Sequence, residues 1–186
     1  MNIEHWLENS LPPPLLEKGV EFIRRRFLEE WRIYRTDVTK DTVLRRKNLI
    51  LFDNSKIIGW LGIESDGELT NACIEKEYKG IYNLIKLIKE AYKISPLDRI
   101  YANVPIIKIA SALAFLKAGM RLEKDPHIIR LKYPEKDVIL VRLSIDKKRN
   151  KLKANHPNAI KAVLKQIKEL NYVYRYNKIP DRNIQE

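Results

Sequence analysis

A turn with a single glycine, Gly80, separates a short apolar run from a helical pattern in this chain. Residues 73–93 read CIEKEYKGIYNLIKLIKEAYK: the apolar run ends at Ile74, and apolar residues return at helical spacing after the glycine. Strand, glycine turn and helix are the parts of a phosphate-binding site, because the first backbone N–H groups of a helix and its dipole attract anions. Two interpretations follow, a site for an anionic cofactor or a plain strand-to-helix turn.

Cysteine and histidine are scarce in this sequence. One cysteine, Cys73, excludes an internal disulfide framework and fits a reducing compartment, so we expect a cytoplasmic protein. Three widely spaced histidines, His5, His127 and His156, disfavour zinc, and no metal site is predicted. Because no histidine is close to Cys73 in sequence, this residue is predicted to be a buried core residue and not a nucleophile.

Length and composition favour a folded, basic protein. The chain has 186 residues, of which 45% are hydrophobic, which suits one domain with a real core, and no apolar run is long enough for a membrane helix. The first residues are not expected to be a signal peptide, because they lack a basic segment followed by an apolar one. Lysine and arginine outnumber aspartate and glutamate by 36 to 24, a formal charge of +12. That balance favours polyanionic partners or anionic cofactors, although a lysine-rich proteome would also produce it.

The hydrophobic periodicity predicts a mixed α/β domain. Residues 49–52, 57–63 and 68–74 form an antiparallel meander, and the helix after Gly80 connects it to a further strand, so that a βαβ crossover follows. The remaining predicted elements are a long helix over 15–34, a short helix capped by Asp37 or Thr39, a strand over 99–104, a helix over 105–117 ended by Gly119, apolar β segments at 120–122 and 128–131, a strand over 138–145, and a last helix from Pro157.

In this order of elements the sequence resembles the GNAT N-acetyltransferases. Three stretches carry the resemblance: SKIIGWLGIESDGELTNACI, EYKGIYNLIKLIKEA and RIYANVPIIKIASALAFLKAGMRLE. They are similar to the family's second to fourth strands, its pyrophosphate loop with the following helix, and its fifth strand and next helix. The resemblance covers residues 48–145. It implies the acyl-CoA N-acyltransferase fold, a mostly antiparallel central sheet flanked by helices, in a domain over 1–145. Residues 146–186 would add a basic linker and a C-terminal helix.

The resemblance implies acetyl-CoA as co-substrate, with its pyrophosphate on the turn. The family loop reads Arg/Gln-x-x-Gly-x-Gly/Ala, and two registers fit it. One begins at Lys79. The other, which we prefer, places Gly80 at the central glycine, with Glu77 at the first position and Tyr82 at the last. The residues implied to contact the co-substrate are Cys73, Ile74, Lys79, Gly80, Ile81, Tyr82, Asn83, Ser111 and Phe115.

The activity implied is direct transfer of an acetyl group to an unidentified amine. Glu68 or Glu64, or a water molecule, would accept the proton from the amine. Phe115 stands where the family has a tyrosine acid, and phenylalanine cannot donate a proton. The alternative is a GNAT-like fold without catalysis that binds nucleic acid or a protein.

Basic residues gather outside these motifs. Arg24–Arg26 are expected on the polar face of the first helix, and a second group lies at residues 45–47. The densest cluster, over 147–153, precedes a helix that ends near Tyr172, Tyr174 and Tyr176. Such a cluster predicts either a nucleic-acid contact or a solvated linker. The apolar stripe of the last helix would dock on the domain or on a second copy in a homodimer.

Overall fold

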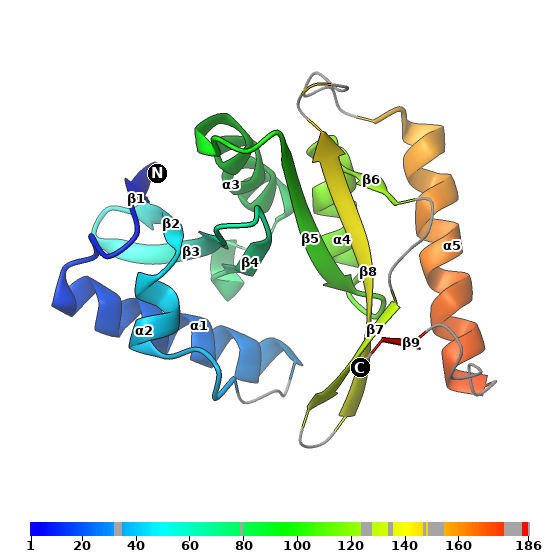
Figure 1. Cartoon of the computed structure of the whole chain (residues 1–186), viewed down its shortest axis with the longest axis horizontal. Helices are drawn as coiled ribbons and strands as arrows, with labels where there is room; N and C mark the ends of the chain where they lie inside the picture. Colours follow the sequence, from blue (N-terminus) through cyan, green and yellow to red (C-terminus); the bar gives the residue numbers. More distant parts are fainter. Residues whose placement is uncertain are drawn as a thin grey trace. The chain divides into compact units, whose positions relative to one another are not determined.

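The computed structural model describes residues 1–31, 35–78, 80–123, 128–133, 136–146, 148, 155–176 and 184–185. The chain forms two compact units, Met1–Leu97 and Asp98–Glu186 (Figure 1). None of the described helices is long and apolar enough to cross a membrane. The division of the chain near residue 145 stays a prediction.

The first unit is built on a four-stranded antiparallel sheet in the order β1-β2-β3-β4. Its strands are β1 (Asn2–Trp6), β2 (Lys47–Asp53), β3 (Lys56–Ile63) and β4 (Leu69–Ile74). The meander of β2, β3 and β4 is as the sequence predicts. Strand β1, which the sequence does not predict, pairs with β2 from Asn2 opposite Phe52 to Trp6 opposite Asn48. This pairing is made across more than forty residues, so it leaves no local pattern in the sequence.

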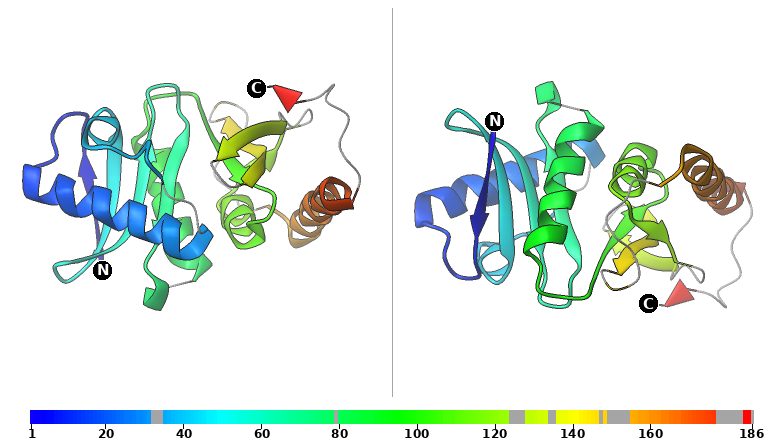
Figure 2. Two further views of the ribbon diagram at one scale, coloured as in Figure 1. Left: turned by 90° about the horizontal axis from the view of Figure 1, so that it is seen from below. Right: turned by 90° about the horizontal axis from the view of Figure 1, so that it is seen from above.

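Two long helices cover opposite faces of this sheet (Figure 2). Helix α1 (Pro13–Trp31) packs on one face, and α3 (Ile81–Ile94) packs on the other. Both follow the predicted 3.6-residue spacing, and in α3 the buried residues are Leu84, Leu87, Ile88 and Ala91. A short helix, α2 (Lys40–Leu44), begins at Thr39, whose hydroxyl accepts a hydrogen bond from the Thr42 backbone N–H at 3.2 Å. Thr39, one of the two predicted caps, is therefore the N-cap.

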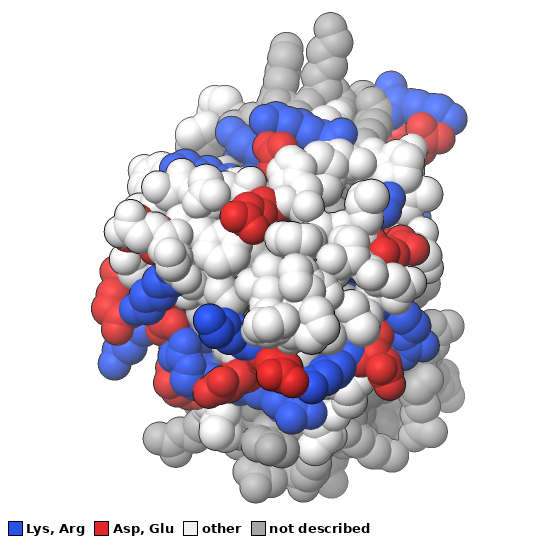
Figure 3. Space-filling model, turned by 90° about the vertical axis from the view of Figure 1, so that its left-hand side faces the viewer, with Lys and Arg blue, Asp and Glu red and all other residues white. Residues whose placement is uncertain are grey.

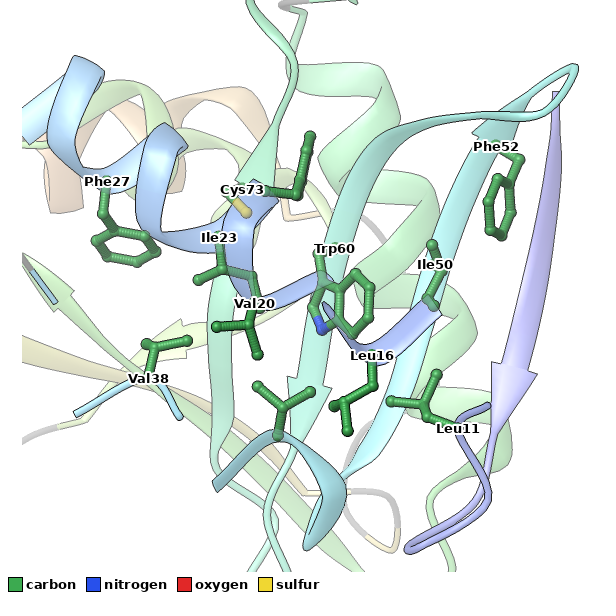
Figure 4. Packing of buried hydrophobic residues seen from close by; sticks show 12 residues of the cluster. Leu11, Leu16, Val20, Ile23, Phe27, Val38, Ile50, Phe52, Trp60 and Cys73 are labelled. Carbon is green, nitrogen blue, oxygen red and sulfur yellow. The ribbon is translucent and has the colours of Figure 1, made fainter. Parts of the chain in front are cut away.

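Trp60 on β3 is the largest side chain of the core between α1 and the sheet. It is fully buried among residues of α1 and of the strands, as Figure 4 shows with Leu16, Val20 and Ile50. Its indole Nε1 donates to Asn48 Oδ1 at 3.0 Å, so its polar atom is satisfied inside the core. The ring also lies against Gly19 of α1. Trp60 is therefore a core residue.

The second unit contains strands in the order β5-β8-β7-β9, with β6 also paired to β8. Its elements are β5 (Arg99–Pro105), α4 (Ile109–Lys117), β6 (Arg121–Leu122), β7 (Ile128–Tyr133), β8 (Lys136–Asp146), α5 (Pro157–Tyr176) and β9 (Ile184–Gln185). Gly119 has a φ of 108° and follows the end of α4, as predicted for a C′ glycine. Asn155 donates to the carbonyls of Leu116 and Met120 at 2.9 and 2.6 Å, which ties the residues before α5 to the end of α4.

The predicted βαβ crossover differs from the structure in one respect. The order β4, α3, β5 is present, but β4 belongs to the sheet of the first unit and β5 to that of the second. Along its whole length, from Arg99 to Pro105, β5 pairs in antiparallel register with β8. The choice of a partner forty residues later in the chain is made by tertiary pairing, which local periodicity does not encode.

Candidate functional site

The turn between β4 and α3 begins with a buried carboxylate, that of Glu75. It accepts two hydrogen bonds from Arg25, Nη1 to Oε1 at 3.2 Å and Nη2 to Oε2 at 2.5 Å, and one from the backbone N–H of Lys76 at 3.0 Å. The guanidinium of Arg25 holds the pKa of the Glu75 carboxyl well below its usual range, at about 2, although burial opposes this shift. The negative charge of Glu75 is therefore neutralised by α1.

Arg26 of α1 is also part of this ion-pair network. Its side chain is only 1% exposed. Its Nε donates to the carbonyl of Ile74 at 3.0 Å, Nη1 forms an ion pair with Glu29, and Nη1 lies 3.8 Å from Glu75 Oε1. The prediction that Arg26 lies on the polar face of the first helix, opposite its apolar face, is wrong, because the side chain is buried. The end of β4 offers it a carbonyl and a carboxylate, and these compensate a buried cation.

Two arginines of the predicted basic groups, Arg24 and Arg46, also have partners within the protein. Arg24 Nε donates to the carbonyl of Val38 at 2.8 Å, and Arg46 forms an ion pair with Glu64. Across one face of the molecule, acidic and basic side chains are interspersed around an uncharged area (Figure 3).

Of the 147–153 cluster, only Lys148 is among the described residues, and it pairs with Asp98 at 2.5 Å. The nucleic-acid contact stays a prediction.

The middle of the turn is a short 3₁₀ helix, η1 (Lys76–Tyr78), held at two points. The Tyr78 hydroxyl donates to Asp53 Oδ2 at 2.6 Å, and this bond raises the pKa of the hydroxyl. Asn83 Nδ2 donates to the carbonyl of Tyr78 at 3.0 Å, which fixes the turn against the first residues of α3. Lys79, predicted to contact the co-substrate, lies outside the described residues.

Gly80 is the N-cap of α3. Its backbone is extended, with φ −176° and ψ 142°, a conformation that any residue adopts. A Cβ placed on it would meet no atom within 4 Å. Packing within the protein therefore does not require glycine at this position. Only a ligand that approaches the backbone closely would require it.

The first turn of α3 has the properties of an anion site. Gly80 makes no side-chain cap, and no acidic residue occurs in the first turn. The N–H groups of Ile81, Tyr82 and Asn83 have no partner within an α-helix, and the helix dipole adds positive potential at this end. Tyr82 is 73% exposed, so its ring extends into solvent. These features fit a phosphate group.

The two candidate bases, Glu64 and Glu68, lie together at the turn between β3 and β4. The backbone N–H of Glu64 donates to the carbonyl of Glu68 at 2.9 Å. The six residues of β4 span about 20 Å at ~3.3 Å per residue, so this pair lies at the other end of β4 from Glu75. The structure therefore does not bring the carboxylates to the glycine turn, and their catalytic role stays a prediction.

Cys73 and Ile74 form the end of β4, beside the arginine network. Both are buried, and Cys73 belongs to the core cluster with Trp60, as the sequence predicts. Burial raises the pKa of the Cys73 thiol far above its usual range, with Arg26 opposing this shift, so the thiol stays protonated at neutral pH. Cys73 is thus not an activated nucleophile.

Ser111 and Phe115 lie on α4 in the second unit. Phe115 is 3% exposed and is part of the core, and Ser111 is half-buried one turn earlier. No proton donor is present at the position of Phe115, because a buried benzyl side chain has none.

Sequence reasoning missed Asn71 on β4. Between the pairs Gly62–Thr70 and Trp60–Cys73, one residue of β3 faces two of β4, which makes a β-bulge that contains Asn71. Asparagine is depleted in strands and tolerates left-handed backbone, so an asparagine inside the run LTNACI was the available signal.

No protein-family model matches the sequence, and a search among curated proteins found no significant match. Solved structures do match. An acyl-CoA N-acyltransferase from Pseudomonas aeruginosa has a TM-score of 0.60 at 14% identity, covering 77% of this chain and 99% of that one. An N-acetyltransferase from Staphylococcus aureus Mu50 has a TM-score of 0.58 at 12% identity, and the match covers 80% of this chain and 99% of that one. A spermidine N-acetyltransferase from Vibrio cholerae, solved with CoA and spermine, has a TM-score of 0.56 at 12% identity. The match covers 78% of this chain and 96% of that one.

At these identities the likeness concerns the fold. The mixed α+β architecture, with antiparallel sheets, flanking helices and a C-terminal helix, confirms the fold that the sequence predicts. The chain has the fold of the GNAT N-acetyltransferases.

Proposed function

We propose that the protein is an acetyl-CoA-dependent N-acetyltransferase. The observation that carries this proposal is the open N-terminus of α3, at the end of the turn that follows β4, in a chain with the GNAT fold. The turn supplies the backbone donors. Of its two carboxylates, Glu75 is neutralised by Arg25, and the exposed Glu77 lies 3.7 Å from Lys56 Nζ. The formal charge of +12 favours a polyanionic co-substrate.

The pyrophosphate would accept hydrogen bonds from the N–H groups of Ile81, Tyr82 and Asn83. Lys76 is exposed beside this turn and adds a positive charge. The space around Gly80 admits a phosphate oxygen close to the backbone, because a Cβ there would meet no atom within 4 Å apart from those of its chain neighbours. The anchors of the turn, Tyr78 on Asp53 and Asn83 on the Tyr78 carbonyl, hold these donors in place before binding.

Acetyl-CoA supplies an acyl group as a thioester. The amine nitrogen attacks the carbonyl carbon, the C–S bond breaks, and the thiolate leaves. The amine proton passes to Glu64, Glu68 or water. These carboxylates are separated from the phosphate-binding turn by β4, and acetyl-CoA carries its acyl group at the opposite end from its phosphates. Because Phe115 has no proton to give, water protonates the thiolate.

Gly80→Glu is expected to lower the affinity for acetyl-CoA at least tenfold, about 1.4 kcal/mol, in isothermal titration calorimetry. The added carboxylate is repelled by the phosphates and occupies the open space at the turn. The matched control is Lys86→Gln, which changes the net charge by the same amount at an exposed position farther along α3. Equal losses in both variants would mean a general charge effect, and wild-type protein without affinity at millimolar acetyl-CoA would exclude the proposal.

The second candidate function is a binding module that has lost catalysis, and the buried Phe115 is the observation that favours it. Release of free thiol from acetyl-CoA in the presence of a panel of primary amines separates the two. Turnover above the uncatalysed rate supports the enzyme. Binding of acetyl-CoA with no turnover for any amine supports the module.

A further inference from the structure

Asn71 occupies an unfavourable backbone conformation in the middle of a buried strand. Its φ is 53°, in the left-handed region, and it belongs to the bulge where two residues of β4 face one of β3. Non-glycine residues are uncommon in this region, and those that persist there are held by their surroundings. Bulges are also over-represented next to functional sites, where they redirect a side chain.

The side chain of Asn71 is buried without a partner. The residue is 4% exposed, and neither Nδ2 nor Oδ1 makes a hydrogen bond. Asn48 gives the contrast within the same sheet. It is 1% exposed, its Nδ2 donates to the carbonyls of Val43 and Arg46 at 2.9 and 2.8 Å, and its Oδ1 accepts from Trp60. Within the described part of the chain, Asn71 alone has both a side-chain donor and a side-chain acceptor buried and unbonded.

Leaving a buried amide unbonded destabilises a fold, and buried polar groups in folded proteins are almost always bonded. Glycine would relieve the backbone conformation at this position and would bring no polar group. Asn71 therefore costs the fold in two ways that a smaller residue would avoid. We propose that its side-chain amide is a ligand-binding group, which gains its partners from a bound ligand; this rests on the proposed acetyltransferase function.

The chemistry of the amide defines the partner. Nδ2 needs an acceptor and Oδ1 needs a donor, and the two are adjacent. A phosphate or carboxylate would satisfy Nδ2 only and would face the negative end of the Oδ1 dipole. An uncharged amide satisfies both atoms. Acetyl-CoA carries such amides in the arm between its phosphates and its thioester, and an acceptor amine that bears an amide is the second source.

Asn71 lies on the strand that leads into the phosphate-binding turn. Ile74 lies three positions farther along β4, about 10 Å of strand at ~3.3 Å per residue. The proposed phosphate site and the unbonded amide are therefore on consecutive segments of one unit. A ligand with a phosphate at α3 and an amide-bearing arm carries both kinds of group.

The test is the variant Asn71→Gly. The proposal predicts that its stability is unchanged or higher and that its affinity for acetyl-CoA is lower. The variant is expected to have a Tm equal to that of the wild type or higher by about 2–4 °C, because the strained backbone and the unbonded amide are removed. Its affinity for acetyl-CoA is expected to fall at least tenfold in calorimetry. Asn48→Ala is the matched control, a buried asparagine with all its bonds made, and it is expected to lower the Tm while the folded protein keeps its affinity.

Two further arms identify the source of the amide. Adenosine 3′-phosphate 5′-diphosphate, the nucleotide part of acetyl-CoA, lacks the arm and should bind wild type and Asn71→Gly equally. If affinity for acetyl-CoA is unchanged, KM is compared for glycinamide and ethylamine, and a rise for glycinamide alone assigns the amide to the acceptor.

The outcomes separate this inference from the proposed function. Wild-type protein that binds no acetyl-CoA overturns both. Wild-type protein that binds acetyl-CoA, with an Asn71→Gly variant that matches it in affinity and shows no selective change in the KM of glycinamide, overturns the role of Asn71 alone. That result would assign the amide to a structural water.

Discussion

Glu75→Gln is expected to lower the free energy of unfolding of the first unit by about 3 kcal/mol at pH 7. Removing one member of a buried ion pair leaves its partner uncompensated, which typically costs ~3–5 kcal/mol. Here the partners are the 1% exposed Arg26 and the bidentate Arg25. The lowering of the Glu75 pKa from 4.5 to about 2 gives a figure of the same size, about 3 kcal/mol at ~1.4 kcal/mol per pH unit.

The effect of Glu75→Gln depends on pH in a defined direction. A carboxyl with a lowered pKa in the folded state contributes stability that is fully present above its unfolded pKa, near 4.5, and that is lost as the pH falls through about 2. The difference between wild type and Glu75→Gln should therefore be constant above pH 5 and should shrink between pH 4.5 and 2.

Urea unfolding followed by tryptophan fluorescence measures this difference. All three tryptophans, Trp6, Trp31 and Trp60, lie in the first unit, so the signal reports on that unit. Glu29→Gln is the control, because Glu29 pairs with the same arginines but is 46% exposed. We expect Glu29→Gln to lower the free energy of unfolding by at most about 1 kcal/mol. A loss in Glu75→Gln that does not change down to pH 2 would contradict the assignment of the stabilisation to the charged carboxylate.

Gly19→Ala is expected to destabilise the first unit by about 2 kcal/mol, although alanine is the better helix former by ~1 kcal/mol. A Cβ on Gly19 would lie 2.3 Å from Trp60 Cη2 and 2.5 Å from Cζ3. Since Trp60 is fully buried and bonded to Asn48, the ring has no room to move away. The same fluorescence measurement gives the change, with Gly80→Ala as control, since a Cβ there meets no atom within 4 Å.

A double-mutant cycle checks the cause of the Gly19→Ala effect. Trp60→Phe alone is destabilising, because the smaller ring leaves a cavity in the core. On this background Gly19→Ala should be neutral or stabilising, since the clash is gone and the helix propensity remains. Additive losses in the double variant would show that the clash with the indole is not the cause.

The described elements of the chain were largely predictable from its sequence, because the periodicity of apolar residues and the turn residues are local properties. The meander over β2, β3 and β4, the helix after Gly80, the cap at Thr39 and the C′ glycine Gly119 all have their causes within a few residues of sequence. The order of these elements was enough to predict the GNAT fold. The position of the open α3 N-terminus followed from the same local pattern.

Tertiary structure decided the pairings and the polar partners. Strand β1 exists because β2 pairs with it, and Arg26 is buried because Glu75 and the Ile74 carbonyl lie beside it, about fifty residues along the chain. The bulge at Asn71 depends on the register of β3 and β4. The strand pairing and the burial of Arg26 rest on contacts between residues distant in sequence, whose geometry no local pattern encodes. For the bulge, the asparagine in LTNACI was the local signal, and the register of the two strands decided its geometry. The sequence alone thus determined where the glycine turn lies, and the fold decided that Glu75 is neutralised, that Gly80 is open, and that Asn71 is buried without a partner.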